Sequence, residues 1–173
     1  MSYSIESTES SAARVERDVW RLLAEVPDPE IPVLSVVELG LIRYVRSDEA
    51  QRVAVGVSPT YTGCPATEVI QSAIRSRLET AGYDEISIDS VLSPPWTSDW
   101  LTESAREKLK EYGIAPPAHA VSHPRHVFRE PEVQCPRCDS PRSQLVSEFG
   151  STPCKALYRC SACLEPFEYF KCI

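Results

Sequence analysis

One stretch of the chain decides the fold, Arg52-Val-Ala-Val-Gly-Val-Ser-Pro-Thr-Tyr-Thr-Gly-Cys-Pro65. Its first half alternates valine with small residues, which is the pattern of a half-buried β-strand. The prolines and the glycine in its second half predict a tight turn. Helical spacing of apolar residues then continues to about Ala81, where Gly82 supplies a stop. The residues predicted on the buried face of this helix are Val69, Ile70, Ala73, Ile74 and Leu78. A strand, a turn and a helix therefore follow one another, with Cys64 at the bend.

The elements on either side complete a small domain. A helix capped by Ser10 or Ser11 runs towards Pro27, and a β-branched strand begins near Gly40. After the central helix, residues 85–92 alternate as a third strand, and a last helix is closed by Gly113. The order α-β-β-α-β-α predicts an α+β fold, a small three-stranded mixed sheet with helices on one face.

Length and charge limit the classes of function. The chain has 173 residues, a net charge of −7 and 42% hydrophobic residues, which fits one domain and a small module. Residues 1–114 carry a net charge of −8, which argues against non-specific electrostatic binding of nucleic acid. No run approaches the roughly 18 apolar residues of a membrane helix. Residues 1–11 are expected to be flexible, and they carry no export signal, so we expect a cytoplasmic protein.

The cysteines are concentrated in the tail, residues 132–173. Six of the seven lie in the last 39 residues, which in a cytosolic chain indicates metal binding rather than disulfides. Two CxxC pairs are separated by 21 residues, a spacing that predicts a ribbon of three strands around structural Zn²⁺. The predicted ligands are Cys135, Cys138, Cys160 and Cys163. An iron–sulfur cluster on the same four thiols is the alternative.

Two cysteines of the tail are left over. Cys154 falls six residues before Cys160, which we interpret as within reach of the metal site. Cys154 and Cys172 are either auxiliary thiols that exchange as ligands, or small core or surface residues.

A proline-rich segment, residues 115–131, precedes the tail and is expected to be an extended linker that separates it from the domain at 12–114. The linker contains all three histidines, His119, His123 and His126. A solvated linker is the favoured interpretation over a metal site, because nothing orders the three rings.

The bend at Cys64 is the best candidate site in the first domain. Pro65 favours the first helical position, which predicts Cys64 as N-cap, with a lowered thiol pKa. Thr60 and Thr62 add hydroxyls, and Gly63 lets a backbone approach closely, so the turn suits an anion or a soft metal. The alternative is a buried structural cysteine.

Two further features allow two interpretations each. The pair Asp28 and Glu30 on a proline-stiffened loop is either functional or a turn that ends the first helix. Trp96 and Trp100 are either core residues or a patch that faces a partner. An independent enzyme is disfavoured, because the chain has no nucleotide loop, no Rossmann fingerprint, and no histidine in residues 1–114.

Two motifs together resemble a known family. Asp28-Pro-Glu-Ile-Pro-Val-Leu-Ser-Val-Val-Glu-Leu-Gly-Leu-Ile42 and Thr60-Tyr-Thr-Gly-Cys-Pro65 resemble the iron–sulfur cluster assembly domain family, which includes SufT, over residues 12–114. Three more segments narrow the resemblance: Ser58-Pro-Thr-Tyr61, Pro94-Pro-Trp-Thr-Ser-Asp-Trp100 and Glu165-Pro-Phe-Glu-Tyr-Phe-Lys-Cys172. With these, nearly the whole chain resembles the PaaD family, the D components of ring-1,2-phenylacetyl-CoA epoxidase.

The resemblance implies a role in aerobic phenylacetate catabolism. The implied partners are a di-iron oxygenase and a reductase with flavin and an iron–sulfur cluster, whose centres the chain would help to mature without performing epoxidation itself. Cys64 matches the family's cysteine and Asp28 its acidic residue, so these two, with Thr60 and Thr62, are candidates to handle transient iron or an iron–sulfur cluster. The alternatives are a structural or coupling subunit without metal transfer, and a zinc-ribbon regulator that binds nucleic acid. The oligomeric state is not predicted.

Overall fold

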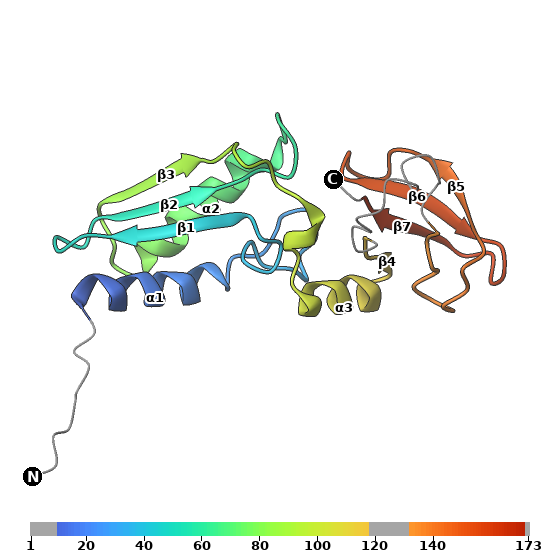
Figure 1. The fold of residues 1–173 in the computed structure, drawn as a ribbon, viewed down its shortest axis with the longest axis horizontal. Coiled ribbons are helices and arrows are strands. Elements are labelled where there is room, and N and C mark those ends of the chain that lie inside the picture. Colours follow the sequence, from blue (N-terminus) through green and yellow to red (C-terminus); the bar gives the residue numbers. More distant parts are fainter. Residues whose placement is uncertain (1–9, 118–131, 172–173) are drawn as a thin grey trace, which may run out of the picture.

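The computed structural model describes residues 10–117 and 132–171, which form two sheets side by side along the long axis of the molecule (Figure 1). The linker histidines and Cys172 lie outside the described residues. None of the described helices is long and apolar enough to cross a membrane.

The first part has the predicted order of elements. It contains α1 (Ser11–Leu23), β1 (Ile42–Ser47), β2 (Val53–Val57), α2 (Ala66–Thr80), β3 (Ile86–Ser90), the short 3₁₀ helix η1 (Ser98–Trp100) and α3 (Glu103–Tyr112). Ser10 caps α1, since its hydroxyl accepts a hydrogen bond from the Ala13 amide. Gly113 ends α3 with a left-handed φ of 93°. The prediction of an α+β fold is confirmed.

The sheet is mixed, as predicted. β1 pairs antiparallel with β2, and β2 pairs parallel with β3 through the α2 crossover. Helices α1 and α2 contact each other and the sheet, whereas α3 lies beyond its end, next to the second sheet (Figure 1). The carboxyl ends of the parallel strands β2 and β3 point towards the second sheet, so the loop after β2 lies at the junction between the two parts (Figure 1).

The second sheet is larger than predicted. It has four strands in the order β4-β7-β6-β5, namely β4 (Ile114–Ala115), β7 (Pro166–Phe170), β6 (Lys155–Cys160) and β5 (Ser143–Ser147). The sequence predicts three. The fourth, β4, directly follows α3 and pairs parallel with β7, so the sheet takes in the residues at the predicted start of the linker.

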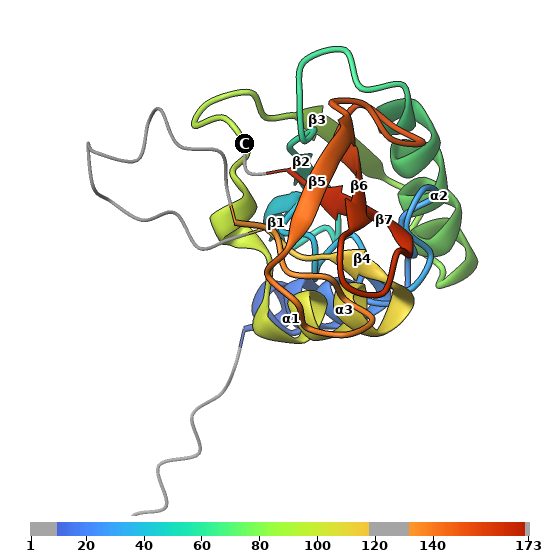
Figure 2. The same cartoon turned by 90° about the vertical axis from the view of Figure 1, so that its right-hand side faces the viewer.

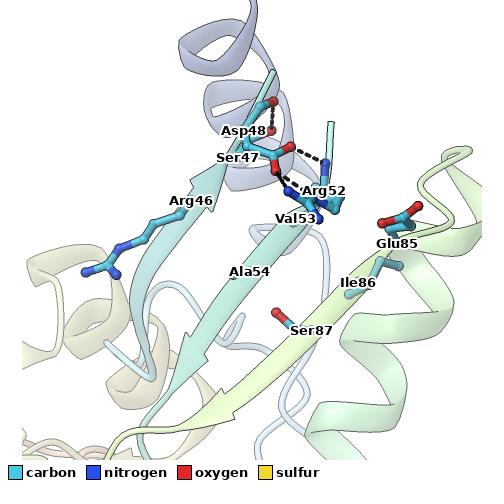
Figure 3. Close-up of a pocket in the computed structure, with 9 residues that line it drawn as sticks. All are labelled: Arg46, Ser47, Asp48, Arg52, Val53, Ala54, Glu85, Ile86 and Ser87. Carbon is cyan, nitrogen blue, oxygen red and sulfur yellow. Dashed lines mark hydrogen bonds and ion pairs between the residues drawn. The ribbon is translucent and has the colours of Figure 1, made fainter. Parts of the chain in front are cut away.

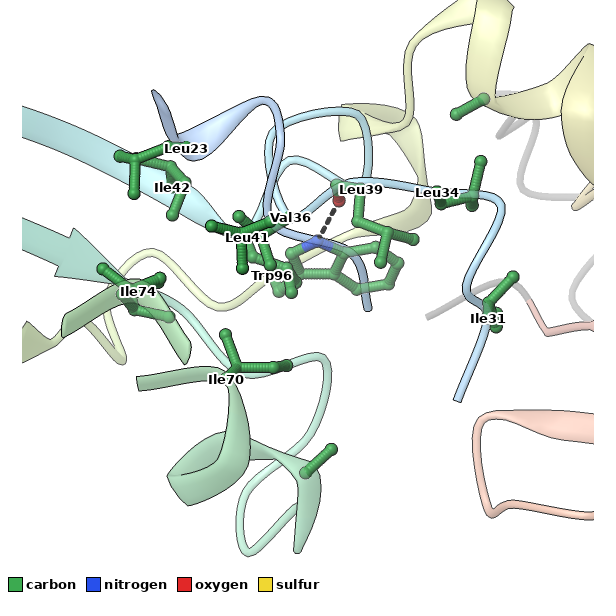
Figure 4. Packing of buried hydrophobic residues seen from close by; sticks show 14 of the residues in the cluster. Leu23, Ile31, Leu34, Val36, Leu39, Leu41, Ile42, Ile70, Ile74 and Trp96 are labelled. Carbon is green, nitrogen blue, oxygen red and sulfur yellow. Dashed lines mark hydrogen bonds between the residues drawn. The ribbon is translucent and has the colours of Figure 1, made fainter. Parts of the chain in front are cut away.

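One hydrophobic core reaches across both parts. Most of it packs between the first sheet and its helices (Figure 4), but Cys154 and Phe170 of the second sheet belong to the same cluster. The ring of Phe170 meets that of Trp96 edge-on, with centroids 6.0 Å apart. Viewed along the long axis, the second sheet lies directly in front of the first (Figure 2). The two parts are therefore packed together, and the expectation of modules decoupled by a linker is wrong.

Both tryptophans pack at the core of the first part. Trp96 is buried and donates its indole N–H to the Leu39 carbonyl at 2.9 Å, so it is a core residue (Figure 4). Trp100 is half-buried, and the guanidinium of Arg43 lies 3.5 Å above its ring.

Candidate functional site

The four thiols of the CxxC pairs come together at one end of the second sheet. Their sulfur atoms all lie within 4.8 Å of one another. The Sγ atoms of Cys135 and Cys163 are 3.7 Å apart, and those of Cys138 and Cys160 are 3.6 Å apart. A tetrahedron with Zn–S bonds of about 2.3 Å has edges of about 3.8 Å, so these four residues fit a zinc ion.

The backbone around each CxxC pair forms a matching turn. The residue after each second cysteine has a left-handed φ, 57° at Asp139 and 66° at Leu164. Backbone N–H groups of Cys163 and Ala162 donate to the sulfur of Cys160 at 3.4 and 3.3 Å, and these bonds lower the pKa of the Cys160 thiol to about 6. A lowered pKa favours the thiolate, which is the form that binds a metal.

A second group of side chains surrounds a small cavity of about 20 Å³ where the two parts meet. Its wall comes from the loop after α1, the turn between β2 and α2, the first turns of α2, the residue before β6 and the end of β7. The polar residues in its wall are Asp28, Glu30, Ser58, Thr60, Cys64, Thr67 and Cys154. The cavity therefore combines two thiols, two carboxylates and three hydroxyls.

Cys64 reaches this cavity from a turn that differs from the prediction. Helix α2 begins at Ala66, so Pro65 holds the cap position with helical torsions (φ −66°, ψ −23°), and the prediction of Cys64 as N-cap is wrong by one residue. Gly63 has a φ of 82° with open space around it, so it serves the turn rather than a close backbone approach. Thr60 lines the cavity, whereas Thr62 is exposed and does not.

Asp28 holds the turn after α1 and also lines the cavity. Its Oδ1 accepts hydrogen bonds from the Glu30 and Ile31 amides at 2.9 and 2.8 Å, which holds the turn after α1. It is also 7% exposed and lines the cavity. Burial raises the pKa of Asp28 above its usual value, although the two amides and Lys155 oppose the shift.

Sequence reasoning missed several residues here. Tyr61 lies beside Cys64, and burial together with a hydrogen bond to that thiol raises the pKa of Tyr61 to about 12. The carboxylate of Glu30 lies 3.8 Å from the sulfur of Cys154. The sequence indicates Glu30 only as one member of a carboxylate pair. Ser58, at the end of β2, is 1% exposed. Ser58 and Tyr61 precede Cys64 in the same turn, and this closeness in the sequence could have identified them.

Cys154 is far from the four-thiol cluster, contrary to the sequence interpretation. It precedes β6 and Cys160 ends β6, so the extended strand holds them roughly 20 Å apart at about 3.3 Å a residue. Cys154 is buried instead beside Glu30, with its sulfur 3.0 Å from the Thr152 hydroxyl. Burial and the charge of Glu30 raise the pKa of the Cys154 thiol.

A wider hollow, about 490 Å³, lies at the opposite end of the first sheet (Figure 3). Two of its charged groups pair with each other, since the carboxylate of Asp48 bonds the guanidinium of Arg52 at 2.6 Å. No thiol lines it. The chemistry of the described residues therefore favours the cavity at the junction.

Comparison with known proteins assigns the chain to a family. It is 52% identical to an Escherichia coli K12 protein provisionally named as the D component of 1,2-phenylacetyl-CoA epoxidase, over 90% of this chain and 92% of that protein. The chain belongs to this family, the PaaD family. Residues 120–171 match the PaaD zinc beta ribbon domain, and residues 16–88 match the iron–sulfur cluster assembly protein family. The resemblances drawn from the sequence are confirmed.

Just over half of this PaaD family member also matches two other proteins over nearly their whole compared length. A Porphyromonas gingivalis W83 protein named Fe-S protein maturation auxiliary factor is 36% identical over 56% of this chain and 91% of its own length. A solved domain of unknown function, DUF59 from Bacillus anthracis, superposes with a TM-score of 0.55 at 30% identity, covering 57% of this chain and 94% of that domain. These comparisons support the α+β fold of the first part.

Proposed function

We propose that this chain is a non-catalytic accessory subunit of a cytoplasmic phenylacetyl-CoA epoxidase system, which helps to mature an iron–sulfur or di-iron centre of the oxygenase or reductase subunits. The ribbon binds structural Zn²⁺ through Cys135, Cys138, Cys160 and Cys163. The iron or cluster is handled at Cys64 and Asp28, with Thr60 in the cavity wall. Thr62, a candidate from the sequence, becomes the control residue because it is exposed.

The observation that carries this proposal is the meeting of Cys64 with the acidic loop at one buried cavity. A thiolate with carboxylates is a donor set that suits iron as cargo. The related maturation factor has a counterpart of this domain and is named for the same task. Zinc adds folding free energy to the ribbon, whose own hydrophobic cluster is small.

The test is Cys64→Ala in cells that also make the epoxidase subunits. The protein should stay folded and keep its zinc, because the variant loses one small side chain near a helix start. The oxygenase or reductase should then lack iron or cluster, measured by elemental analysis of the purified partners. Thr62→Ala is the matched control and should leave the metal content of the partners unchanged. Unchanged partner metal in Cys64→Ala would contradict the proposal.

A coupling role without metal transfer is the second candidate. It is favoured by the edge of the ribbon, where Leu145, Val146 and Phe149 are 42%, 58% and 62% exposed and suit a protein partner. If coupling is the role, the partners should carry normal metal, and wild-type protein added during turnover should restore activity to the Cys64→Ala system. A maturation defect precedes turnover, so late addition should restore little.

A further inference from the structure

The cavity at the junction is built from both parts of the molecule. Cys64 comes from the turn after β2, and Cys154 comes from the start of β6 in the ribbon. Both thiols line this one small cavity. The first domain alone therefore presents only one of the two thiols.

An unsatisfied polar group also faces this cavity. Ser58 is 1% exposed and lines the cavity wall, and its hydroxyl has no hydrogen-bond partner among the residues that the structure describes. A buried hydroxyl without a partner loses about 1–3 kcal/mol of solvation that nothing replaces. Such an atom points to a ligand or an ordered water in the cavity. It is an observation independent of the cysteines.

The size and charge of the cavity define that ligand. A volume of about 20 Å³ holds one water-sized particle and excludes a multi-iron cluster. Carboxylates of Asp28 and Glu30 lie in the same wall, and the sulfur of Cys154 is 3.8 Å from Glu30. Thiolates with a carboxylate prefer a divalent transition metal to a hard cation such as Mg²⁺.

We infer that Cys64 and Cys154 bind a single divalent transition-metal ion between the two parts of the chain, with Glu30 as the third ligand and the Ser58 hydroxyl facing the ion. This inference rests on the proposed function and adds to it that the cargo is one ion, and that the ribbon supplies a ligand. Within the described residues, only the four ribbon thiols already lie within 4.8 Å of one another. Glu30 and the sulfur of Cys154 are already 3.8 Å apart, so binding at the cavity needs a side-chain rotation of the half-buried Cys64 towards them.

The neighbouring charges agree with a site for a cation. Burial and the charge of Asp28 raise the pKa of Glu30, and burial raises that of Cys154. Among the described residues, the positive charge of Lys155 lowers the pKa of Asp28, Glu30 and Cys154 and so opposes these shifts. The ammonium of Lys155 is itself paired with Glu168 at 2.9 Å. A bound metal ion would provide positive charge directly among the acids and thiols, and would displace the thiol protons to solvent.

The test is an anaerobic titration of the full-length, zinc-loaded protein with Co²⁺, which gives thiolate charge-transfer absorption. The wild type should bind one Co²⁺ per chain while it retains its zinc. Cys154→Ser and Cys64→Ser should each weaken Co²⁺ binding more than tenfold and reduce the charge-transfer intensity by about half, because one of two thiolates is lost. Thr62→Ala is the matched control and should bind as the wild type does.

The outcomes separate this inference from the proposed function. The inference is overturned if the zinc-loaded wild type binds no Co²⁺, or if Cys154→Ser binds it as tightly as the wild type with the same absorption. The latter result would leave a cargo site on Cys64 alone, so the proposed function would stand. Conversely, loss of Co²⁺ binding in both variants, with normal partner metal in Cys64→Ala cells, supports the site and contradicts the maturation role.

Discussion

Phe170 joins the ribbon to the first domain, and its removal should destabilise the whole protein. Its side chain is 1% exposed, and its ring contacts Trp96 edge-on within the core of the first domain. Phe170→Ala deletes that contact and leaves a cavity at the junction. The expected effect is loss of stability in both parts, not in the ribbon alone.

The magnitude follows from the burial. Truncation of a fully buried phenylalanine to alanine costs about 3–5 kcal/mol, which combines the lost transfer free energy and the cavity. The edge-on pair with Trp96 accounts for about 0.5–1.5 kcal/mol of such a loss. We expect a decrease of about 4 kcal/mol in the free energy of unfolding. For a chain of this length that decrease lowers the melting temperature by about 10 °C.

The assay is urea unfolding of the zinc-loaded protein, followed by tryptophan fluorescence and by circular dichroism. Phe149→Ala is the matched control, because this phenylalanine also belongs to the ribbon but is 62% exposed. It should change the free energy of unfolding by about 0.5 kcal/mol or less. If Phe170→Ala is no more destabilising than Phe149→Ala, the two parts do not share a core and the reasoning is wrong.

Three further predictions concern charge and metal. Glu168→Gln should lower the free energy of unfolding by about 3 kcal/mol, measured in urea, because it leaves the ammonium of Lys155, 4% exposed, buried without its counter-charge. Glu38 is partly buried, which opposes ionisation, but hydrogen bonds from Lys108 and Ser35 lower its pKa below the usual 4.5. The stabilisation that ionised Glu38 provides is therefore complete above pH 4.5 and is lost as the pH falls through the folded-state pKa. The free energies of unfolding of the wild type and Glu38→Gln should differ by about 1 kcal/mol at pH 7 and become equal in acid. Cys163→Ser should reduce zinc content by elemental analysis and also lower the melting temperature of the first domain.

Each of these has a control or a contradicting result. Asp18→Asn, the control for Glu168→Gln, breaks an exposed ion pair with Arg21 and should lower the free energy of unfolding by less than about 1 kcal/mol. If Glu168→Gln lowers it by no more than this control, Lys155 is not effectively buried. A stability difference at Glu38 that persists unchanged below its folded-state pKa would contradict the assigned pKa direction. A first domain that melts normally in zinc-free Cys163→Ser would contradict the shared core.

Local patterns predicted the elements of the first domain because its strands and helices are set by short-range periodicity. The alternating valines of β2 and the serine cap of α1 carry their signals within a few residues. The four ribbon thiols were predictable for the same reason, since CxxC spacing is itself a local geometry. The position of Cys64 at the start of α2 was wrong by only one residue, which is the usual uncertainty of a helix boundary.

The junction was not predictable from the sequence. No local pattern indicates that Ile114–Ala115 pair with β7, because strand pairing at this separation depends on the packing of both parts. The proline-rich segment favours separate modules, and the burial of Phe170 against Trp96 overrides that expectation. The burial of Ser58 in a cavity wall was likewise not predictable, because residues of the ribbon complete the cavity that it lines.

Strand β6 links the two sites physically. One end carries Cys160, a predicted zinc ligand, and the residue before its other end is Cys154 at the cavity beside Cys64. An extended strand of this length is stiff, so fixing the zinc end also fixes where Cys154 lies. Loss of zinc should therefore withdraw one thiol from the cavity and expose Trp96 at the same time. On this argument the proposed zinc ion is required for the proposed metal site at the cavity, although the two sites share no ligand.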